Sequence, residues 1–294
     1  MEVYRALGLL IEAPAEGHRT VAAALDLPPV PDGAIHGTEV AFQRYPYASV
    51  YLGEEGKLGG EARHRIAGFW TALGMEPPNE PDHLSTLLSL LTSLDEAASR
   101  GADGAEAALL RQARTTLAWE HLHAWCVPYL QCFRSSPSSY YRAWADLTRR
   151  AIREALPTAL PGRLPGALIA AAEHSLTDPR TDGRSGGFVP RLLAPVRSGV
   201  VFLRSDLADL ADAVGLAMRA GERAYALSWF LGQDPAGTLQ WLGGFAERWA
   251  RGLEDECESS DAVVAWWAER ARGTASLLAD LAEDVEAGSL VGES

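Results

Sequence analysis

The sequence predicts an all-α protein. Apolar side chains recur at helical spacing, as at Ile66, Phe69, Trp70 and Leu73, which fall at i, i+3, i+4 and i+7. No hairpin dipeptide stands between alternating apolar runs, and the one strand-like stretch, residues 199–203, is an isolated apolar pentamer. We find no convincing internal repeat. A helical bundle without a sheet is therefore expected.

The first half of the chain is punctuated by prolines and one capping residue. A proline-rich connector at residues 27–33 breaks the pattern after two short helices. Asp82 precedes the apolar run that begins at Leu84, where an N-cap belongs. Pro128 lacks a backbone N–H and should kink the longest predicted helix. The helices expected here cover residues 2–11, 21–25, 60–75, 84–99 and 105–133.

The second half begins with a helix whose first position suits Pro137, with Ser136 as its cap. Prolines between residues 157 and 165 mark a break, and residues 166–176 then form a small alanine-rich helix. Residues 177–195 are dense in Gly, Pro, Arg and Ser and are a candidate linker or mobile loop. The first of the last three helices is expected to have Ser205 as its cap, and the other two are expected to open at Asp234-Pro235 and at Ser260-Asp261.

Composition indicates a soluble globular chain, with 47% hydrophobic and 22% charged residues. The formal net charge is −13, and Lys57 is the only lysine. Because nucleic-acid binding needs a basic surface, this charge argues against nucleic acid as a partner. It favours a basic partner instead.

The compartment predicted from the sequence is the cytoplasm. Cys126, Cys132 and Cys257 are an odd number without a CxxC pair, which favours a reducing environment. The first residues carry no basic segment, and their apolar run ends at Glu12 and Pro14. We therefore expect neither a secretory signal nor insertion in a membrane.

Catalytic motifs are weak, so we expect no enzyme and no cofactor. The chain has no GxSxG, HExxH or phosphate-loop pattern. Glu120, His123 and Cys126 fall at i, i+3 and i+6, and a metal would accept all three residue types. No fourth ligand is evident, and the neighbouring tryptophans suggest a core. A metal-dependent enzyme using His123 and Cys126 remains an alternative.

The stretch from Tyr45 to His83 has the most distinctive composition, with an aromatic block, a glycine-rich turn and a Glu80-Pro81-Asp82-His83 corner. Pro81 fixes its own φ and disfavours helix at Glu80, so the chain must bend there. One interpretation of the corner is a helix cap with an incidental histidine. The other is a binding site, in which Tyr47 and Tyr51 wall a groove.

These motifs resemble the TorD/DmsD family of chaperones, a NarJ-like superfamily, over roughly residues 36–155. The resemblance rests on Tyr45-Pro46-Tyr47, Ser49-Val50-Tyr51-Leu52-Gly53, Gly59-Gly60-Glu61, Glu80-Pro81-Asp82-His83, Leu117-Ala118-Trp119-Glu120-His121-Leu122, Trp125, Pro128-Tyr129-Leu130 and Phe133. It implies a helical bundle of the TorD/DmsD type at residues 1–160, with a shortened N-terminal segment. Residues 161–294 would be an additional C-terminal helical extension that packs on this core.

The resemblance also implies a function. The protein would be a cytoplasmic chaperone that binds the twin-arginine signal peptide and the apo form of a molybdopterin oxidoreductase, as a monomer or homodimer. The alternative is a helical scaffold or regulatory module with the same fold and a different partner. A receptor for such a peptide needs an apolar groove and carboxylates for the guanidinium groups. The predicted peptide-binding residues are Pro46, Tyr47, Tyr51, Phe69, Trp70, Glu80, Pro81, Asp82 and His83. Asp82 cannot both cap a helix fully and engage arginine.

Overall fold

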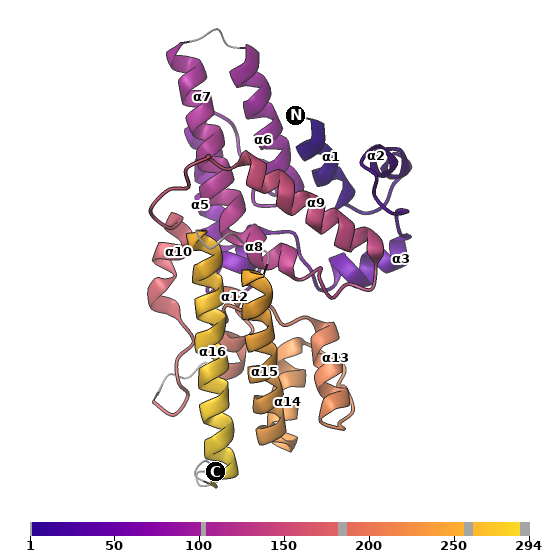
Figure 1. The fold of residues 1–294 in the computed structure, drawn as a ribbon, viewed down its shortest axis with the longest axis vertical. Coiled ribbons are helices and arrows are strands. Elements are labelled where there is room, and N and C mark those ends of the chain that lie inside the picture. The colour runs from indigo at the N-terminus through magenta and orange to yellow at the C-terminus, as the bar shows by residue number, and fades with distance from the viewer. Residues whose placement is uncertain (1, 101–103, 182–186, 256–260, 289–294) are drawn as a thin grey trace. The chain divides into compact units, whose positions relative to one another are not determined.

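A computed structural model describes residues 2–100, 104–181, 187–255 and 261–288 (Figure 1). Within these ranges the secondary structure is helical and no β-strand is present, which confirms the all-α prediction. Residues 200–203 form an irregular, buried segment instead of a strand. Tyr47 and His83 form an isolated antiparallel β-bridge outside any strand.

The helices of the first half match most of the predicted ranges. They are α1 (Glu2–Leu10), α2 (His18–Ala24), α3 (Gly33–His36), α4 (Ala48–Leu52), α5 (Gly60–Ala72), α6 (Leu84–Arg100), α7 (Ala105–Thr116), α8 (Ala124–Gln131), α9 (Ser139–Ala155) and α10 (Gly166–Ala170), with π-helical segments η1 (Gly37–Ala41) and η2 (Leu117–His123). The long helix predicted over 105–133 is present as α7, η2 and α8 in succession, with Pro128 inside α8. The predicted cap of α9 was wrong, because Ser138 accepts the hydrogen bond from Tyr141 N, and Ser136 serves another role.

The second half contains a short 3₁₀ turn, η3 (Ala172–His174), and further helices. These are α11 (Phe188–Leu192), α12 (Pro195–Ser198), α13 (Arg204–Ala213), α14 (Arg223–Gln233), α15 (Pro235–Glu254) and α16 (Ala262–Glu286). Helix α15 opens at Asp234-Pro235 and α16 at Asp261, as predicted, and the side chains of Asp234 and Asp261 cap them; Ser260 lies outside the described residues. Ser205 was predicted to cap α13 but lies inside it, and the Asp206 carboxylate accepts a hydrogen bond from Leu203 N instead. The predicted loop 177–195 contains α11, and its residues 182–186 lie outside the described ranges.

The chain divides into two compact units. The first comprises residues 1–53 and 57–170, and the second comprises residues 54–56 and 171–294. Glu54 belongs to the second unit because Arg197 donates to both its carbonyl and its carboxylate, each at 2.8 Å. That the C-terminal part packs on the core stays a prediction.

The first unit is built on α1, α6 and α9. Helix α1 packs against α6 and α9, and α6 packs against α7. Two side chains tie α9 to α1: Trp144 Nε1 donates to Leu7 O at 3.0 Å, and Tyr140 OH donates to Leu10 O at 3.1 Å. The core between them is aromatic, with Trp144 edge-on to Phe133 at 5.4 Å.

The second unit is organised by the antiparallel pair α15 and α16. Helix α12 ends at Gly199, whose φ of +74° lies in the left-handed region. A Cβ at this position would lie 2.4 Å from Ala271 N of α16, so only glycine allows this close approach. No helix among the described residues has the length and apolar character needed to cross a membrane.

Candidate functional site

The two halves of the predicted motif are brought together in space. Pro46 O accepts a hydrogen bond from Leu84 N at 2.8 Å, and Ala48 N donates to Asp82 O at 3.0 Å. These bonds form the bridge that pairs Tyr47 with His83. The tyrosine block and the corner, more than thirty residues apart, therefore form one structure.

A buried ion pair anchors the chain just before this bridge. Arg44 Nη1 donates to Glu39 Oε2 at 3.2 Å, and both side chains are almost fully buried. Arg44 Nε also donates to Cys132 O at 3.0 Å, and Ser136 Oγ donates to Glu39 Oε2 at 2.5 Å. Because Arg44 and Glu39 pair with each other and form these further hydrogen bonds, their charges are tolerated in the interior. This use of its hydroxyl explains why Ser136 does not cap α9.

Asp82 caps a different helix from the one predicted. Its Oδ2 accepts a hydrogen bond from Ser49 N, in the first turn of α4, at 3.1 Å, and the residue is only 2% exposed. The prediction that it caps α6 was wrong, because the bend at Pro81 turns the carboxylate towards α4. His83 takes the position before α6: its carbonyl accepts from Leu87 N at 3.0 Å, and Ser85 N lies 3.3 Å from its Nδ1.

The imidazole of His83 sits beneath a polar surface. Its Nδ1 lies 2.8 Å from Ser85 Oγ, which in turn donates to Glu12 Oε1 at 2.5 Å. The ring of Tyr47 packs edge-on against it, with centroids 4.6 Å apart. Burial lowers the pKa of His83, while the carboxylates of Glu12, Glu80 and Asp82 oppose this shift. The net lowering favours a neutral imidazole near neutral pH.

Tyr47 and Glu80 lie at the surface beside this histidine. Tyr47 OH donates to Glu80 Oε1 at 2.8 Å, and the glutamate is exposed. Burial, followed by the hydrogen bond to Glu80, raises the pKa of the Tyr47 hydroxyl, so it stays protonated and can donate. Glu12, Tyr47, Glu80 and Ser85 are called the acidic-aromatic surface below.

The other predicted site residues lie mostly in the interior. Tyr51 is 1% exposed and stacks on Trp125 at a centroid distance of 5.6 Å, so it belongs to the core in this structure and not to a groove wall. Trp70 is buried and its Nε1 donates to Pro81 O at 3.4 Å. Phe69 is half-buried. Pro46, Pro81, Asp82 and His83 are buried as well.

Sequence reasoning missed Glu12 and Ser85. Glu12 lies two residues after the end of α1, and Ser85 is the second residue of α6. Their side chains meet across a separation of 73 residues. No local pattern reports such a contact, so only the packing of α1 on α6 could reveal it.

The residues considered for a metal site make other contacts. Glu120 Oε2 accepts a hydrogen bond from Gly166 N at 2.6 Å, and His123 stacks on Trp119 at 5.6 Å. Burial raises the pKa of the Cys126 thiol, which disfavours the thiolate that a metal needs. Among the described residues, no group of His, Cys, Asp or Glu is arranged to hold a metal ion.

The class defined by these observations is a helical protein whose most distinctive surface is an acidic and aromatic patch over a buried Asp-His corner. One family model matches the chain: residues 43–130 match the nitrate reductase delta subunit. This match is consistent with the redox-enzyme maturation chaperones that the sequence resembles. No curated protein and no solved structure shows significant similarity to the chain.

Proposed function

We propose that the protein is a chaperone for a molybdenum oxidoreductase and assists its maturation in the cytoplasm, before export or assembly. In this role it is a maturation factor and not a catalyst. The observation that carries the proposal is the match at residues 43–130, because that range holds the whole Tyr47–His83 structure. The finer part of the proposal is that it binds the twin-arginine signal peptide and the apo form of its client.

The acidic-aromatic surface offers the chemistry that an arginine pair requires. Glu12 and Glu80 are exposed carboxylates, and each can accept hydrogen bonds from a guanidinium group. The neighbouring Tyr47 ring can stack with the planar cation. Since His83 is favoured in its neutral form, it does not repel an approaching arginine.

In this proposal the buried corner has a positioning role. Asp82 fixes the start of α4, and the bridge between Tyr47 and His83 sets where the tyrosine ring lies. This assignment removes the conflict over Asp82, because its carboxylate caps α4 while Glu80 and Glu12 face solvent. Peptide recognition is thus assigned to Tyr47, Glu80 and Glu12.

The test uses the full chain and a synthetic peptide that carries two adjacent arginines followed by an apolar segment. The Glu12→Gln/Glu80→Gln variant should weaken binding about tenfold, since each exposed charge contact contributes roughly 0.5–1 kcal/mol. It should also reduce the dependence of affinity on salt. Glu106→Gln, an exposed glutamate in the first turn of α7, is the matched control. Unchanged affinity in the double variant would remove the surface from the proposal.

The client is tested separately by co-purification. A molybdenum oxidoreductase subunit with a twin-arginine leader is the expected partner. Stable capture of a soluble partner that lacks such a leader would favour the helical scaffold instead.

A further inference from the structure

The loop that joins α13 to α14 gathers arginine and aromatic side chains at the surface of the second unit. Helix α14 packs against both α13 and α15 (Figure 1). Arg204, at the start of α13, donates from Nη1 to Gly221 O at 2.6 Å. Arg223, at the start of α14, donates to Phe202 O. The end of the loop is therefore held against the start of α13, which brings these two arginines close together.

Two aromatic side chains continue this surface along α14. Tyr225 is 60% exposed, so most of its ring contacts water. Trp229 follows at i+4, which places both rings on one face of the helix. The guanidinium carbon of Arg219 lies 4.5 Å from the centroid of the Trp229 ring, a cation–π contact that holds the arginine in place. Arg204, Arg219, Arg223, Tyr225 and Trp229 are called the basic-aromatic patch below.

The arginines of this patch have no carboxylate partner in the described part of the chain. Glu222, exposed in the same loop, forms no ion pair there either. Elsewhere in the unit, Arg197 pairs with Glu54 and Arg272 pairs with Glu254. Carboxylates are not scarce, because residues 171–294 contain 20 acidic residues and 11 arginines. The patch thus keeps a positive charge that no carboxylate neutralises by contact.

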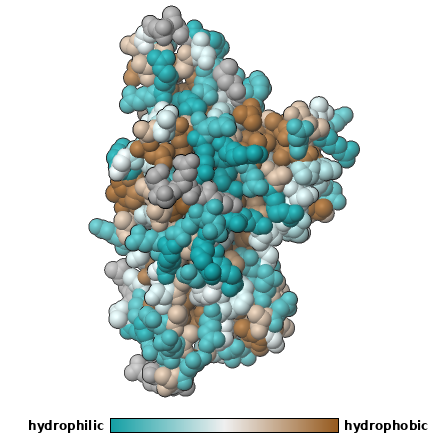
Figure 2. All heavy atoms as spheres, in the orientation of Figure 1, coloured by the Kyte–Doolittle hydropathy of each residue, from teal (hydrophilic) through white to brown (hydrophobic). Residues whose placement is uncertain are grey.

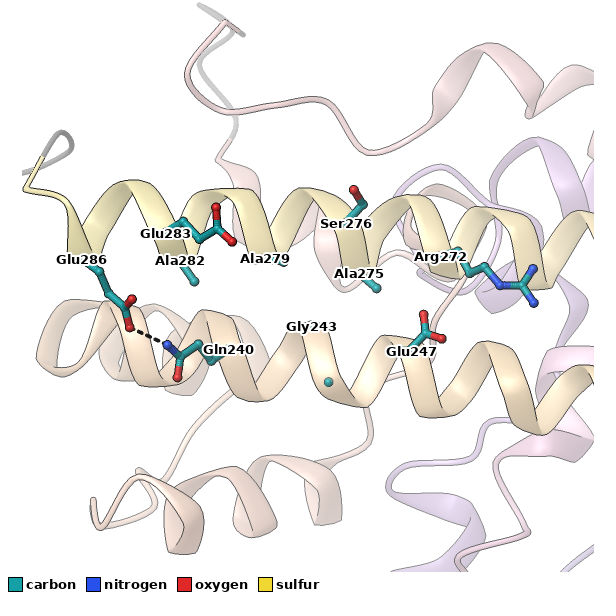
Figure 3. A pocket seen from close by; sticks show the side chains of 11 residues that line it. Gln240, Gly243, Glu247, Arg272, Ala275, Ser276, Ala279, Ala282, Glu283 and Glu286 are labelled. Atoms are coloured by element: carbon teal, nitrogen blue, oxygen red, sulfur yellow. Dashed lines mark hydrogen bonds between the residues drawn. The ribbon is translucent and has the colours of Figure 1, made fainter.

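Several carboxylates of the unit lie on another surface. The open groove between α15 and α16 is lined by Glu247, Glu283 and Glu286 (Figure 3). Its arginine, Arg272, is already paired. On the face shown in Figure 2, the second unit presents mainly hydrophilic and intermediate side chains, with small apolar areas between them. An acidic ligand would be repelled by the groove and attracted by the basic-aromatic patch.

We propose that the basic-aromatic patch binds an acidic segment of a partner protein, in which aspartate or glutamate residues flank an apolar side chain. The carboxylates of the segment would accept hydrogen bonds from the guanidinium groups, whose planar fork matches a carboxylate. The apolar side chain would cover the exposed ring of Tyr225. Arginine, tyrosine and tryptophan are also the residue types that contribute most to binding energy in protein interfaces. This inference goes beyond the proposed function, since the ligand has the opposite charge to a twin-arginine peptide and binds the other unit.

An acidic protein segment fits the patch better than a nucleic acid does. Bases bind by stacking on open aromatic faces, and Arg219 already lies over the ring of Trp229. The net negative charge of residues 171–294 would also repel a long phosphate chain. A segment with a few carboxylates needs only the patch itself.

The experiment uses the full chain and a fluorescent peptide of about 12 residues, long enough to cross the patch when extended. In this peptide, pairs of aspartate and glutamate flank a central leucine and phenylalanine. A second peptide carries asparagine and glutamine in place of the acids, and an oligothymidine of similar length is the third probe. Fluorescence anisotropy should show saturable binding of the acidic peptide below about 200 μM and about tenfold weaker binding of the amide peptide. High salt should weaken binding of the acidic peptide.

Two substitutions test the patch, and a third controls for the lost charge. Arg219→Gln removes the cation over Trp229 and should weaken binding of the acidic peptide about fivefold. Tyr225→Ala removes the exposed ring and should weaken it about fivefold as well. Arg111→Gln removes the same charge from an exposed position of α7, in the first unit, and should bind as the wild type does. Circular dichroism and thermal unfolding establish that each variant is folded.

Four results would overturn the inference: no saturable binding of the acidic peptide, equal binding of the amide peptide, wild-type affinity in both patch variants, or an equal loss in Arg111→Gln. Tighter binding of the oligothymidine than of the acidic peptide would also overturn it, in favour of a nucleic acid. None of these results bears on the proposed function, which is decided by the client that co-purifies and by Glu12 and Glu80.

Discussion

The capping role of Asp82 can be tested by a single deletion of its carboxylate. In Asp82→Ala, Ser49 N loses its acceptor while Ser49 stays fully buried. Loss of a cap costs about 1 kcal/mol, and a buried donor left without a partner costs about 1–3 kcal/mol. We therefore expect the free energy of unfolding to fall by about 2 kcal/mol.

Thermal unfolding followed by circular dichroism is the assay. For a domain the size of the first unit, about 1 kcal/mol corresponds to a shift of about 2–4 °C, so Tm should fall by about 4–8 °C. Two compact units can unfold in separate steps, in which case the shift belongs to the transition of the first unit. Asp82→Asn keeps an acceptor oxygen, so its Tm should fall by about half as much as that of Asp82→Ala, or less. Glu80→Ala, at the exposed neighbour, should change Tm by less than about 2 °C.

The reasoning would be refuted if Asp82→Ala unfolded at the wild-type temperature. It would also be refuted if Asp82→Asn were as damaging as Asp82→Ala, since that result would make the charge matter and not the hydrogen bond. The first outcome would mean that the Asp82 carboxylate is not needed for stability, and the second that its charge matters more than its role as an acceptor.

Two further predictions concern the packing and the titration of buried groups. Gly199→Ala should lower the free energy of unfolding of the second unit by about 3 kcal/mol or more, because its Cβ would meet Ala271 N at 2.4 Å. Gly215 also has a positive φ but has open space around it, so Gly215→Ala should cost only about 1–2 kcal/mol. Urea unfolding measures both losses. Burial, and then Arg65, lower the pKa of His121 to about 4, so the unfolded chain takes up a proton between pH 6.5 and 4 that the folded chain does not. Stability should therefore fall by up to about 3 kcal/mol as the pH drops through this window, and His121→Gln should remove that part of the slope; an unchanged slope would contradict the shift.

The helices were largely predictable because their apolar stripes depend on spacing alone. The stripe at Ile66 and Trp70 marks α5, and both residues are buried. The wrong caps share one cause. Asp82 finds its partner Ser49 across 33 residues, and Ser136 finds Glu39 across 97 residues. A capping residue is recognised by its place in the sequence, but these side chains bond to groups that only the fold brings near.

The candidate site shows the same division. Sequence pattern singled out Tyr47 and Glu80, and they form one hydrogen bond in the structure. The aromatic character of Tyr51 suggested a groove, yet a tyrosine has enough apolar area to pack in a core, and here it stacks on Trp125. Composition cannot separate these two uses, since both require the same side chain.

Burial changes which substitutions are informative about binding. A variant that removes Asp82 or His83 alters the start of α4 or α6, so a loss of peptide binding in it reports on folding as well as on recognition. Substitutions at the exposed Glu12 and Glu80 leave those helix starts intact. A comparison of the two kinds of variant separates the buried framework from the surface it supports.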